Sequence, residues 1–326
     1  MTKLSSADVP TSCLVPARSH PRAEEIGREV DGYFLEHWPF PNEKARLKFL
    51  GAGFSRVTCM YFPLALDDRI HFACRLLTLL FLIDGESFRV WKFWEWKLKE
   101  SDLLEHMSLA AGAEYNERLM RISRGALPDN SIPAESITYE LWESMRAHDL
   151  DMANDILEPV FVFMRAQTDS TRLKPLDMRA YLEYRERDVG KALLGSLMRF
   201  SMGLHVSAAE LSAAAPADMT CSKHLSVVND IWSYEKELKA SKTAHEEGGV
   251  LCTSVAILAR DASLSIPAAK RVLYSMCREW ELQYKENERA VLEVRDTPAL
   301  RTYLLGLELQ MTGNELWSRT TERYLS

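Results

Sequence analysis

Apolar residues recur along most of this chain at the spacing of an α-helix, and the alternation typical of strands joined by hairpin turns is absent. The pattern predicts helices over 22–38, 43–52, 66–84, 103–120, 134–148, 150–168, 177–203, 207–214, 219–240, 250–261, 267–290 and 297–323. Several segments, including 72–83, are apolar on nearly every side, which is typical of central helices in a large bundle. We therefore expect an all-α fold with a flexible N-terminal tail over 1–21 and a single domain over 22–326.

Composition narrows the functional classes. The 326 residues carry a net charge of −7 and no run rich in Lys and Arg, so a nucleic-acid-binding surface is not expected. The most apolar stretch, 76–83, is too short to span a bilayer, and the polar N-terminus does not resemble a signal peptide. The six cysteines show no metal-binding spacing and are typical of reduced core thiols. We expect a cytoplasmic protein without a stable membrane anchor.

The segment VVNDIWSYEKE places three oxygen-bearing side chains at steps of four residues: Asn229, Ser233 and Glu237. Such steps keep side chains on one face of a helix. Amide, hydroxyl and carboxylate oxygens are hard ligands that suit Mg²⁺ rather than zinc, and the neighbouring Lys236 is long enough to reach a phosphate. A polar stripe facing water has the same spacing, so this pattern alone leaves both interpretations open.

A second cluster of acids is split along the chain. The apolar helix that contains FLID ends at Asp84, and the acidic pattern resumes as DLLEHMS from Asp102. Joining the two flanks gives FLIDDLLEHMS, in which Asp84, Asp102 and Glu105 would lie close together as metal ligands. The 17 residues over 85–101, GESFRVWKFWEWKLKES, separate them.

With this joined motif the chain resembles the class I terpene cyclases, specifically the fungal aristolochene synthases. The resemblance also rests on GYFLEHWPFPNEKA, ALDDRIHFACRLLTLLFLID, LEPVFVFMRAQTD, YLEYRERDVGK, CSKHLSVVNDIWSYEKE and GNELWSRTTERY. It implies a class I terpenoid synthase bundle around an apolar pocket, with Mg²⁺, three ions in the family pattern, between the two motifs. It further implies cyclisation of farnesyl diphosphate through a germacrene intermediate to aristolochene, a bicyclic sesquiterpene, with release of diphosphate.

The same resemblance implies roles for other residues. Contacts to the diphosphate are expected from Arg185, Lys236, Arg323 and Tyr324, and guanidinium groups suit phosphate because they bind it bidentately. The aromatic side chains expected to line the pocket and stabilise carbocations are Tyr61, Phe81, Phe163 and Trp317. Without the resemblance, Arg185 would be read as a surface residue paired with Glu183 or Asp188, and the aromatic residues as ordinary core.

The 85–101 segment departs from the family pattern. We hypothesise that it is translated intron, because codons for Gly85-Glu86-Ser87 can contain a splice donor, codons for Ser101-Asp102 can contain an acceptor, and excision keeps the frame. A lineage-specific loop is the alternative. Either way the insert could leave a catalytically impaired or non-catalytic diphosphate-binding form.

Two further expectations concern rivals and assembly. A prenyl chain-elongating transferase would need a second aspartate-rich motif, and VVNDIWSYEKE argues against it. An apolar helix face would support a homo-oligomer, a dimer, although the pattern does not separate such a face from core.

Overall fold

The computed structural model describes residues 9–83, 108–242 and 250–324, and within them the chain is helical with no strand. The α-helices are α1 (Ala23–His37), α2 (Glu43–Ala52), α3 (Phe54–Tyr61), α4 (Ile70–Ile83), α5 (Leu109–Ser123), α6 (Pro133–His148), α7 (Leu150–Gln167), α8 (Met178–Asp188), α9 (Lys191–Met202), α10 (Ala208–Ala240), α11 (Ser254–Asp261), α12 (Ile266–Val294) and α13 (Pro298–Thr320). Two 3₁₀ turns are η3 (Ser170–Leu173) and η4 (Glu322–Tyr324). The all-α prediction is confirmed.

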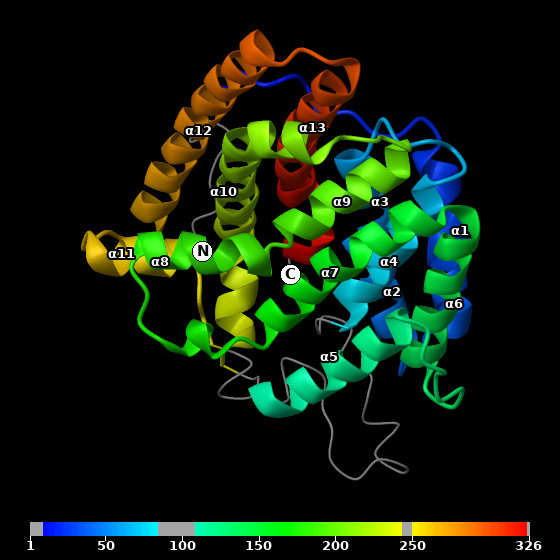
Figure 1. Cartoon of the computed structure of the whole chain (residues 1–326). Helices are drawn as coiled ribbons and strands as arrows, with labels where there is room; N and C mark the ends of the chain where they lie inside the picture. Colours follow the sequence, from blue (N-terminus) through cyan, green and yellow to red (C-terminus); the bar gives the residue numbers. More distant parts are fainter. Residues whose placement is uncertain (1–8, 84–107, 243–249, 325–326) are drawn as a thin grey trace.

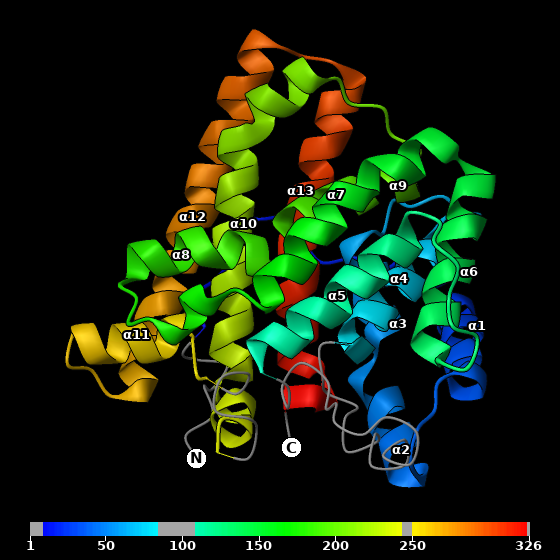
Figure 2. The same ribbon diagram turned by 60° about the horizontal axis from the view of Figure 1, so that its bottom comes forward.

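The long helices α10 and α13 lie side by side in the middle of the bundle (Figure 1). Helices α8, α11 and α12 pack on one side of α10, and α3 and α9 pack against α13. The remaining helices complete the other half, as the turned view also shows (Figure 2): α1, α2, α4, α5, α6 and α7. No helix among the described residues is long and apolar enough to cross a membrane.

Helix α10 is continuous, whereas the sequence predicted two helices over 207–214 and 219–240. It begins with a capping box: the Glu210 backbone N–H donates to the Ser207 hydroxyl, and the Ser207 backbone N–H donates to the Glu210 carboxylate. Pro216 lies inside the helix and removes one backbone hydrogen bond. Packing of α10 against α12 and α13 outweighs that loss, so the prediction of a break was wrong.

Three other elements differ from the prediction. The helix predicted over 177–203 is broken into α8 and α9 at Gly190, whose positive φ of 76° suits glycine because other residues meet a steric penalty there. Helix α3 was not predicted, since its residues are buried on nearly every side and show no polar face. The predicted 66–84 begins later in the structure, at Ile70, and 84 lies outside the described residues.

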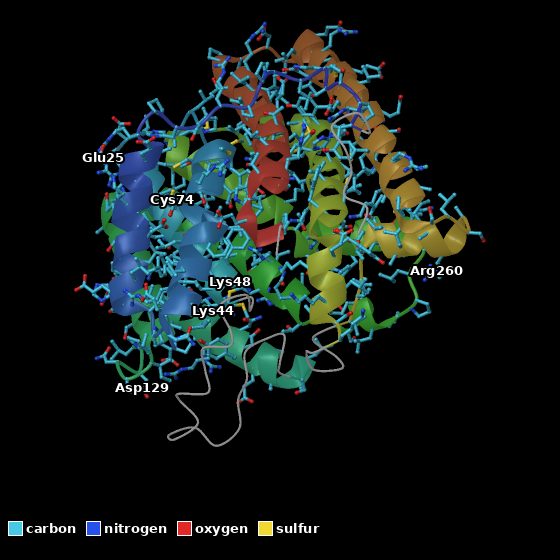
Figure 3. The ribbon with its side chains drawn as sticks, turned by 180° about the vertical axis from the view of Figure 1, so that it is seen from behind. Glu25, Lys44, Lys48, Cys74, Asp129 and Arg260 are labelled. Carbon is cyan, nitrogen blue, oxygen red and sulfur yellow. The ribbon has the colours of Figure 1, made fainter. Side chains whose placement is uncertain are left out.

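The chain before α1 is packed against the bundle from Val9, the first described residue, onward. The Ser12 hydroxyl and the Cys13 backbone N–H donate to Glu281 of α12 at 2.8 and 3.0 Å, and the Val15 N–H donates to Glu308 of α13 at 2.9 Å. Figure 3 shows this segment crossing α13 toward α12. The sequence predicted a flexible tail over 1–21, and these hydrogen bonds join part of it to α12 and α13; residues 1–8 lie outside the described residues.

Glu281 belongs to a buried ionic cluster between α10, α12 and α13. His224 contacts Glu281 at 3.2 Å, and Arg278 bridges Glu281 and Glu315. Burial would raise the pKa of both carboxyls, but His224 and Arg278 at Glu281, and Arg278 at Glu315, hold each pKa below its ordinary value. Although these side chains lie close enough to hold a metal ion, the guanidinium already supplies the positive charge. We interpret the cluster as structural.

Candidate active site

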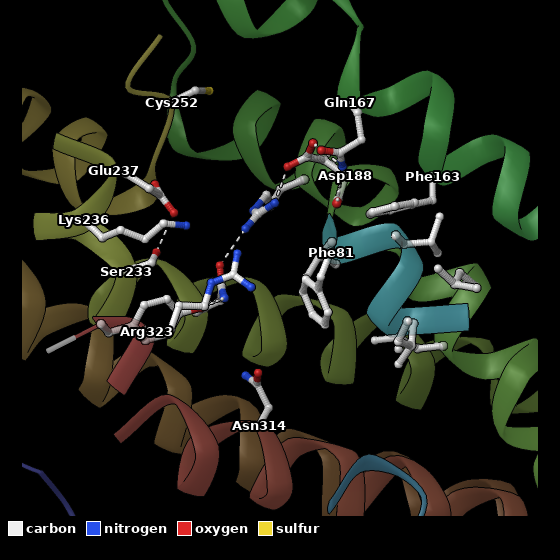
Figure 4. Close-up of a pocket in the computed structure, with 18 of the residues that line it drawn as sticks. Phe81, Phe163, Gln167, Asp188, Ser233, Lys236, Glu237, Cys252, Asn314 and Arg323 are labelled. Carbon is white, nitrogen blue, oxygen red and sulfur yellow. Dashed lines mark hydrogen bonds and ion pairs between the residues drawn. The ribbon is translucent and has the colours of Figure 1, made fainter. Parts of the chain in front are cut away.

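A cavity of about 210 Å³ opens between α4, α7, α8, α9, α10 and α13. Every predicted site residue that lies within the described ranges lines it: Tyr61, Phe81, Phe163, Arg185, Asn229, Ser233, Lys236, Glu237, Trp317, Arg323 and Tyr324. Ser233, Lys236, Glu237 and Arg323 gather at one end, and Phe81 and Phe163 lie toward the other (Figure 4). The cavity therefore joins a polar end to an aromatic one.

The polar end is built on α10. The Ser233 hydroxyl donates to Glu237 at 2.6 Å, and the Asn229 side-chain oxygen accepts from Arg185 at 2.9 Å while its NH₂ group donates to the Tyr324 hydroxyl at 2.8 Å. The one-face arrangement expected from the four-residue spacing is confirmed. Because these groups offer hard oxygen atoms beside a cavity, they suit a divalent cation such as Mg²⁺.

Arg185 is held between two helices. One guanidinium nitrogen pairs with Asp188 of its own helix, and the other reaches Asn229 at 2.9 Å and Asp230 at 3.5 Å on α10. Burial would lower the pKa of Arg185, but Asp188 and Asp230 hold it well above its usual range, so the charge persists. The pairing with Asp188 is one of the two that we considered for a surface arginine. Arg185 is not a surface residue, however, because its side chain is only 14% exposed and lines the cavity.

The chain's last described residues close the polar end. Arg323 is buried, and its guanidinium carbon lies 5.3 and 5.0 Å from the ring centres of Phe54 and Phe81. The Tyr324 ring meets the Trp317 ring edge-on at 5.4 Å. Cation–π contacts of this kind hold Arg323 over the aromatic wall.

The aromatic end is a stacked wall. Phe81 stacks on Phe54 with ring centres 4.6 Å apart and on Trp317 at 6.5 Å. The Tyr61 hydroxyl, itself buried, donates to Asn314 at 2.8 Å. Phe163 packs against Gly190, where an added Cβ would lie 3.1 Å from the ring, so the break between α8 and α9 shapes this wall.

Sequence reasoning did not select several polar residues that line or support the cavity: Gln167, Asp188, Asp230 and Asn314. Gln167 donates to Asp188 at 3.1 Å, and Figure 4 shows the two side chains next to each other. Asp230 is 1% exposed, and burial raises its pKa to about 6 even though Arg185 acts against the shift. Only the sequence position of Asp230 next to Asn229 could have drawn attention to it.

The other half of the predicted metal site cannot be placed. Asp84, Asp102, Glu105 and the insert over 85–101 lie outside the described residues. Their predicted roles stay predictions, as do the individual roles of the residues that line the cavity.

Comparisons with known proteins bear on this geometry. Residues 102–283 match the family described as terpene synthase family 2, C-terminal metal binding, and the match begins at the first residue after the predicted insert. The chain is 62% identical to aristolochene synthase of Aspergillus terreus over 322 residues. This aligned region covers 98% of this chain and 95% of the relative. It is 61% identical to (+)-aristolochene synthase of Penicillium expansum, covering 97% and 91%.

The chain belongs to the terpene synthase family, among the fungal aristolochene synthases. The crystal structure of aristolochene synthase from Penicillium roqueforti agrees, with a TM-score of 0.81 at 54% identity over 96% of this chain and 100% of that one. The resemblance inferred from sequence is confirmed, and with it the class I terpenoid synthase fold. Membership in this metal-binding family indicates a divalent metal.

Proposed function

We infer that this terpene synthase cyclises farnesyl diphosphate to aristolochene and releases diphosphate. The observation that carries this conclusion is the cavity itself, which joins cationic and oxygen-bearing side chains at one end to a stacked aromatic wall at the other. The close identity to aristolochene synthases over nearly the whole chain supports the same reaction.

Asn229, Ser233 and Glu237 would hold Mg²⁺. Their side chains share one face of α10 and line the cavity, which supports a common metal site. Ser233 donates to Glu237, and the Asn229 side-chain oxygen accepts from Arg185. When bound, Mg²⁺ would neutralise the negative charge that develops on the leaving diphosphate. Asp84 is proposed as a further ligand, joined by Asp102 and Glu105 if the insert is absent or looped out.

The cationic residues stabilise the leaving group. Arg185, Lys236 and Arg323 line the same end of the cavity, and Tyr324 places a hydroxyl beside Asn229. Groups held in place before the reaction stabilise developing charge without reorganisation, and the effect is larger where water is excluded. Ionisation of the carbon–oxygen bond would therefore begin at this end.

The aromatic wall receives the prenyl chain. Phe81, Phe163, Trp317 and Tyr61 offer ring faces whose quadrupoles stabilise a carbocation, and their packing shapes the folded chain. An apolar lining that excludes water protects the carbocation from reaction with water. These residues carry no group that forms a covalent bond in this scheme.

The impaired alternative rests on the insert over 85–101, which lies outside the described residues, and nothing in the comparisons favours it. We retain three finer proposals from the sequence: a homodimer, a cytoplasmic location and a single domain over 22–326. The net charge of −7 continues to argue against nucleic-acid binding.

The proposed function is tested by incubating the purified chain with farnesyl diphosphate and Mg²⁺, with and without isopentenyl diphosphate, and analysing products by gas chromatography–mass spectrometry. We expect aristolochene in both reactions. A longer prenyl diphosphate in the second reaction would instead indicate a chain-elongating transferase. Unreacted substrate with folded protein would contradict both readings.

A further inference from the structure

We propose that Asp230 is a positioning residue that holds both Arg185 and the segment leading into α11 against the diphosphate-binding end of the cavity. The inference deepens the proposed function and rests on it. Asp230 does not line the cavity. It is on α10, next to Asn229 in sequence, and it contacts Arg185 of α8. Its effect on the reaction would therefore be exerted through the residues that it holds.

One carboxylate oxygen of Asp230 accepts three hydrogen bonds. They come from the Tyr181 hydroxyl of α8 at 2.6 Å and from the backbone N–H and hydroxyl of Ser254 at 2.9 and 2.6 Å. Ser254 is the first residue of α11, whose N-cap is Thr253. All three donors belong to fully buried residues, so no water is at hand to replace the carboxylate. Asp230 thus joins α8, α10 and α11 at one point.

The second oxygen of Asp230 faces Arg185. It lies 3.5 Å from the guanidinium nitrogen that also donates to Asn229 at 2.9 Å, while the other terminal nitrogen pairs with Asp188. The planar guanidinium is thereby fixed from two helices. Its Nε finds no hydrogen-bond partner within the described residues, so the orientation depends on these contacts at its terminal nitrogens.

The second element that Asp230 holds also reaches the cavity. Val250 and Cys252, just before Ser254, are lining residues. Cys252 lies beside the polar end in Figure 4. Because Asp230 fixes Ser254, it fixes the position of this short wall relative to Arg185. Arg185 and the segment that contains Val250 and Cys252 are thus both held by one buried carboxylate, that of Asp230.

A carboxylate is required here, and an amide of the same shape would not serve. In Asp230→Asn one oxygen becomes an NH₂ group, which only donates. If that group faced Arg185, two donors would oppose each other across the contact. If it faced the other way, it would meet the donors of Tyr181 and Ser254. Either orientation leaves buried donors without an acceptor, and Arg185 also loses a compensating charge.

The test measures binding of inorganic diphosphate, in Mg²⁺ buffer, to the full chain by isothermal titration calorimetry. We expect Asp230→Asn to weaken the affinity by about 10- to 100-fold, the usual effect of removing a group that orients a ligand-binding residue. The matched control is Asp218→Asn, on the same helix. Asp218 is also buried, has the Tyr303 hydroxyl 3.0 Å from both of its oxygens, and does not line the cavity. Its replacement should lower thermal stability but leave diphosphate affinity unchanged.

A double-mutant comparison separates positioning from a general loss of structure. Val250 and Cys252 offer diphosphate no charged side chain, so the effect of Asp230 on diphosphate affinity should run through Arg185. Asp230→Asn in an Arg185→Ala background should therefore change that affinity by less than about twofold. A full 10- to 100-fold loss in that background would overturn the proposal. Asp230→Ser, which leaves room for a water molecule beside Ser254, is the replacement if Asp230→Asn does not fold, and the same results are expected of it.

The outcomes for the proposed function and for this inference are distinct. If the unmodified chain binds no diphosphate in Mg²⁺ buffer, the proposed function fails. If the unmodified chain binds diphosphate and Asp230→Asn binds it equally well, only the positioning role fails. If both Asp230→Asn and Asp218→Asn weaken binding to the same extent, the effect is one of general stability and the inference is also wrong.

Discussion

The same substitution, glycine to alanine, should have opposite effects at two helical positions of this bundle. A Cβ built at Gly313 of α13 would lie 2.4 Å from the backbone oxygen of Met60 in α3, whereas a Cβ at Gly32 of α1 meets nothing within 4 Å. Ordinary contacts begin near 3.4 Å. Because the obstacle at Gly313 is backbone, α3 and α13 would have to separate by about 1 Å.

The magnitudes follow from two terms. Alanine is favoured over glycine inside a helix by about 1 kcal/mol, so Gly32→Ala should stabilise the protein by up to that amount. Overpacking costs about 1–3 kcal/mol, and the upper end applies where backbone must move, so Gly313→Ala should lower the free energy of unfolding by about 2 kcal/mol net. The separation should also lengthen the 2.8 Å hydrogen bond between Tyr61 and Asn314, the residues that follow Met60 and Gly313.

Denaturant unfolding, followed by circular dichroism, measures both effects, and steady-state kinetics with farnesyl diphosphate follows the active site. We expect a higher unfolding midpoint for Gly32→Ala with unchanged turnover, and a lower midpoint with reduced turnover for Gly313→Ala. An equal or raised midpoint for Gly313→Ala would refute the close approach of α3 and α13 on which the cavity geometry depends.

Four other outcomes follow from the structure. Arg185→Lys, which loses the planar fork, should lower kcat/KM for farnesyl diphosphate by about 100-fold, and an unchanged value would contradict its place at the diphosphate. Chelation with EDTA should abolish hydrocarbon formation and Mg²⁺ should restore it; activity in metal-free buffer would count against the assignment of Asn229. The lowered pKa values of Glu281 and Glu315 stabilise the fold above the unfolded pKa near 4.3, and this contribution is lost as pH falls through the folded pKa values. Unfolding free energies measured from pH 6 to pH 3 should therefore fall less steeply in Glu281→Gln, and parallel curves would contradict the assignment. A chain lacking 85–101 should form hydrocarbon at least as fast as the full chain, and a folded but inactive deletion would contradict the hypothesis that these residues are translated intron.

Sequence periodicity located most helices because their buried and exposed faces differ. It missed α3, because a helix that is surrounded by protein has no polar face and therefore shows no helical alternation of polar and apolar residues. It also misjudged Pro216 and Gly190, where the outcome depends on tertiary packing and on a single positive φ rather than on the local pattern. The anchoring of Ser12 depends on a buried carboxylate on α12, more than 260 residues away in sequence.

The candidate site was predicted to the extent that it lies on one helix or matches a family segment. The spacing of Asn229, Ser233 and Glu237 places them on one face, which the structure confirms. The family resemblance, and not the residue spacing, led us to predict that Arg185 and the aromatic residues belong to the same site. Asp230 and Asn314 escaped because their partners come from other helices, and no pattern within one segment reports such contacts.

The central claim, that this cavity ionises a prenyl diphosphate and keeps water from the resulting cation, is tested most directly by product stoichiometry. Inorganic diphosphate and extracted hydrocarbon would be quantified in the same reaction of the purified chain with farnesyl diphosphate and Mg²⁺. The account predicts equal amounts of diphosphate and sesquiterpene hydrocarbon. Diphosphate released with farnesol in place of hydrocarbon would contradict the claim, because it would show that water reaches the cation.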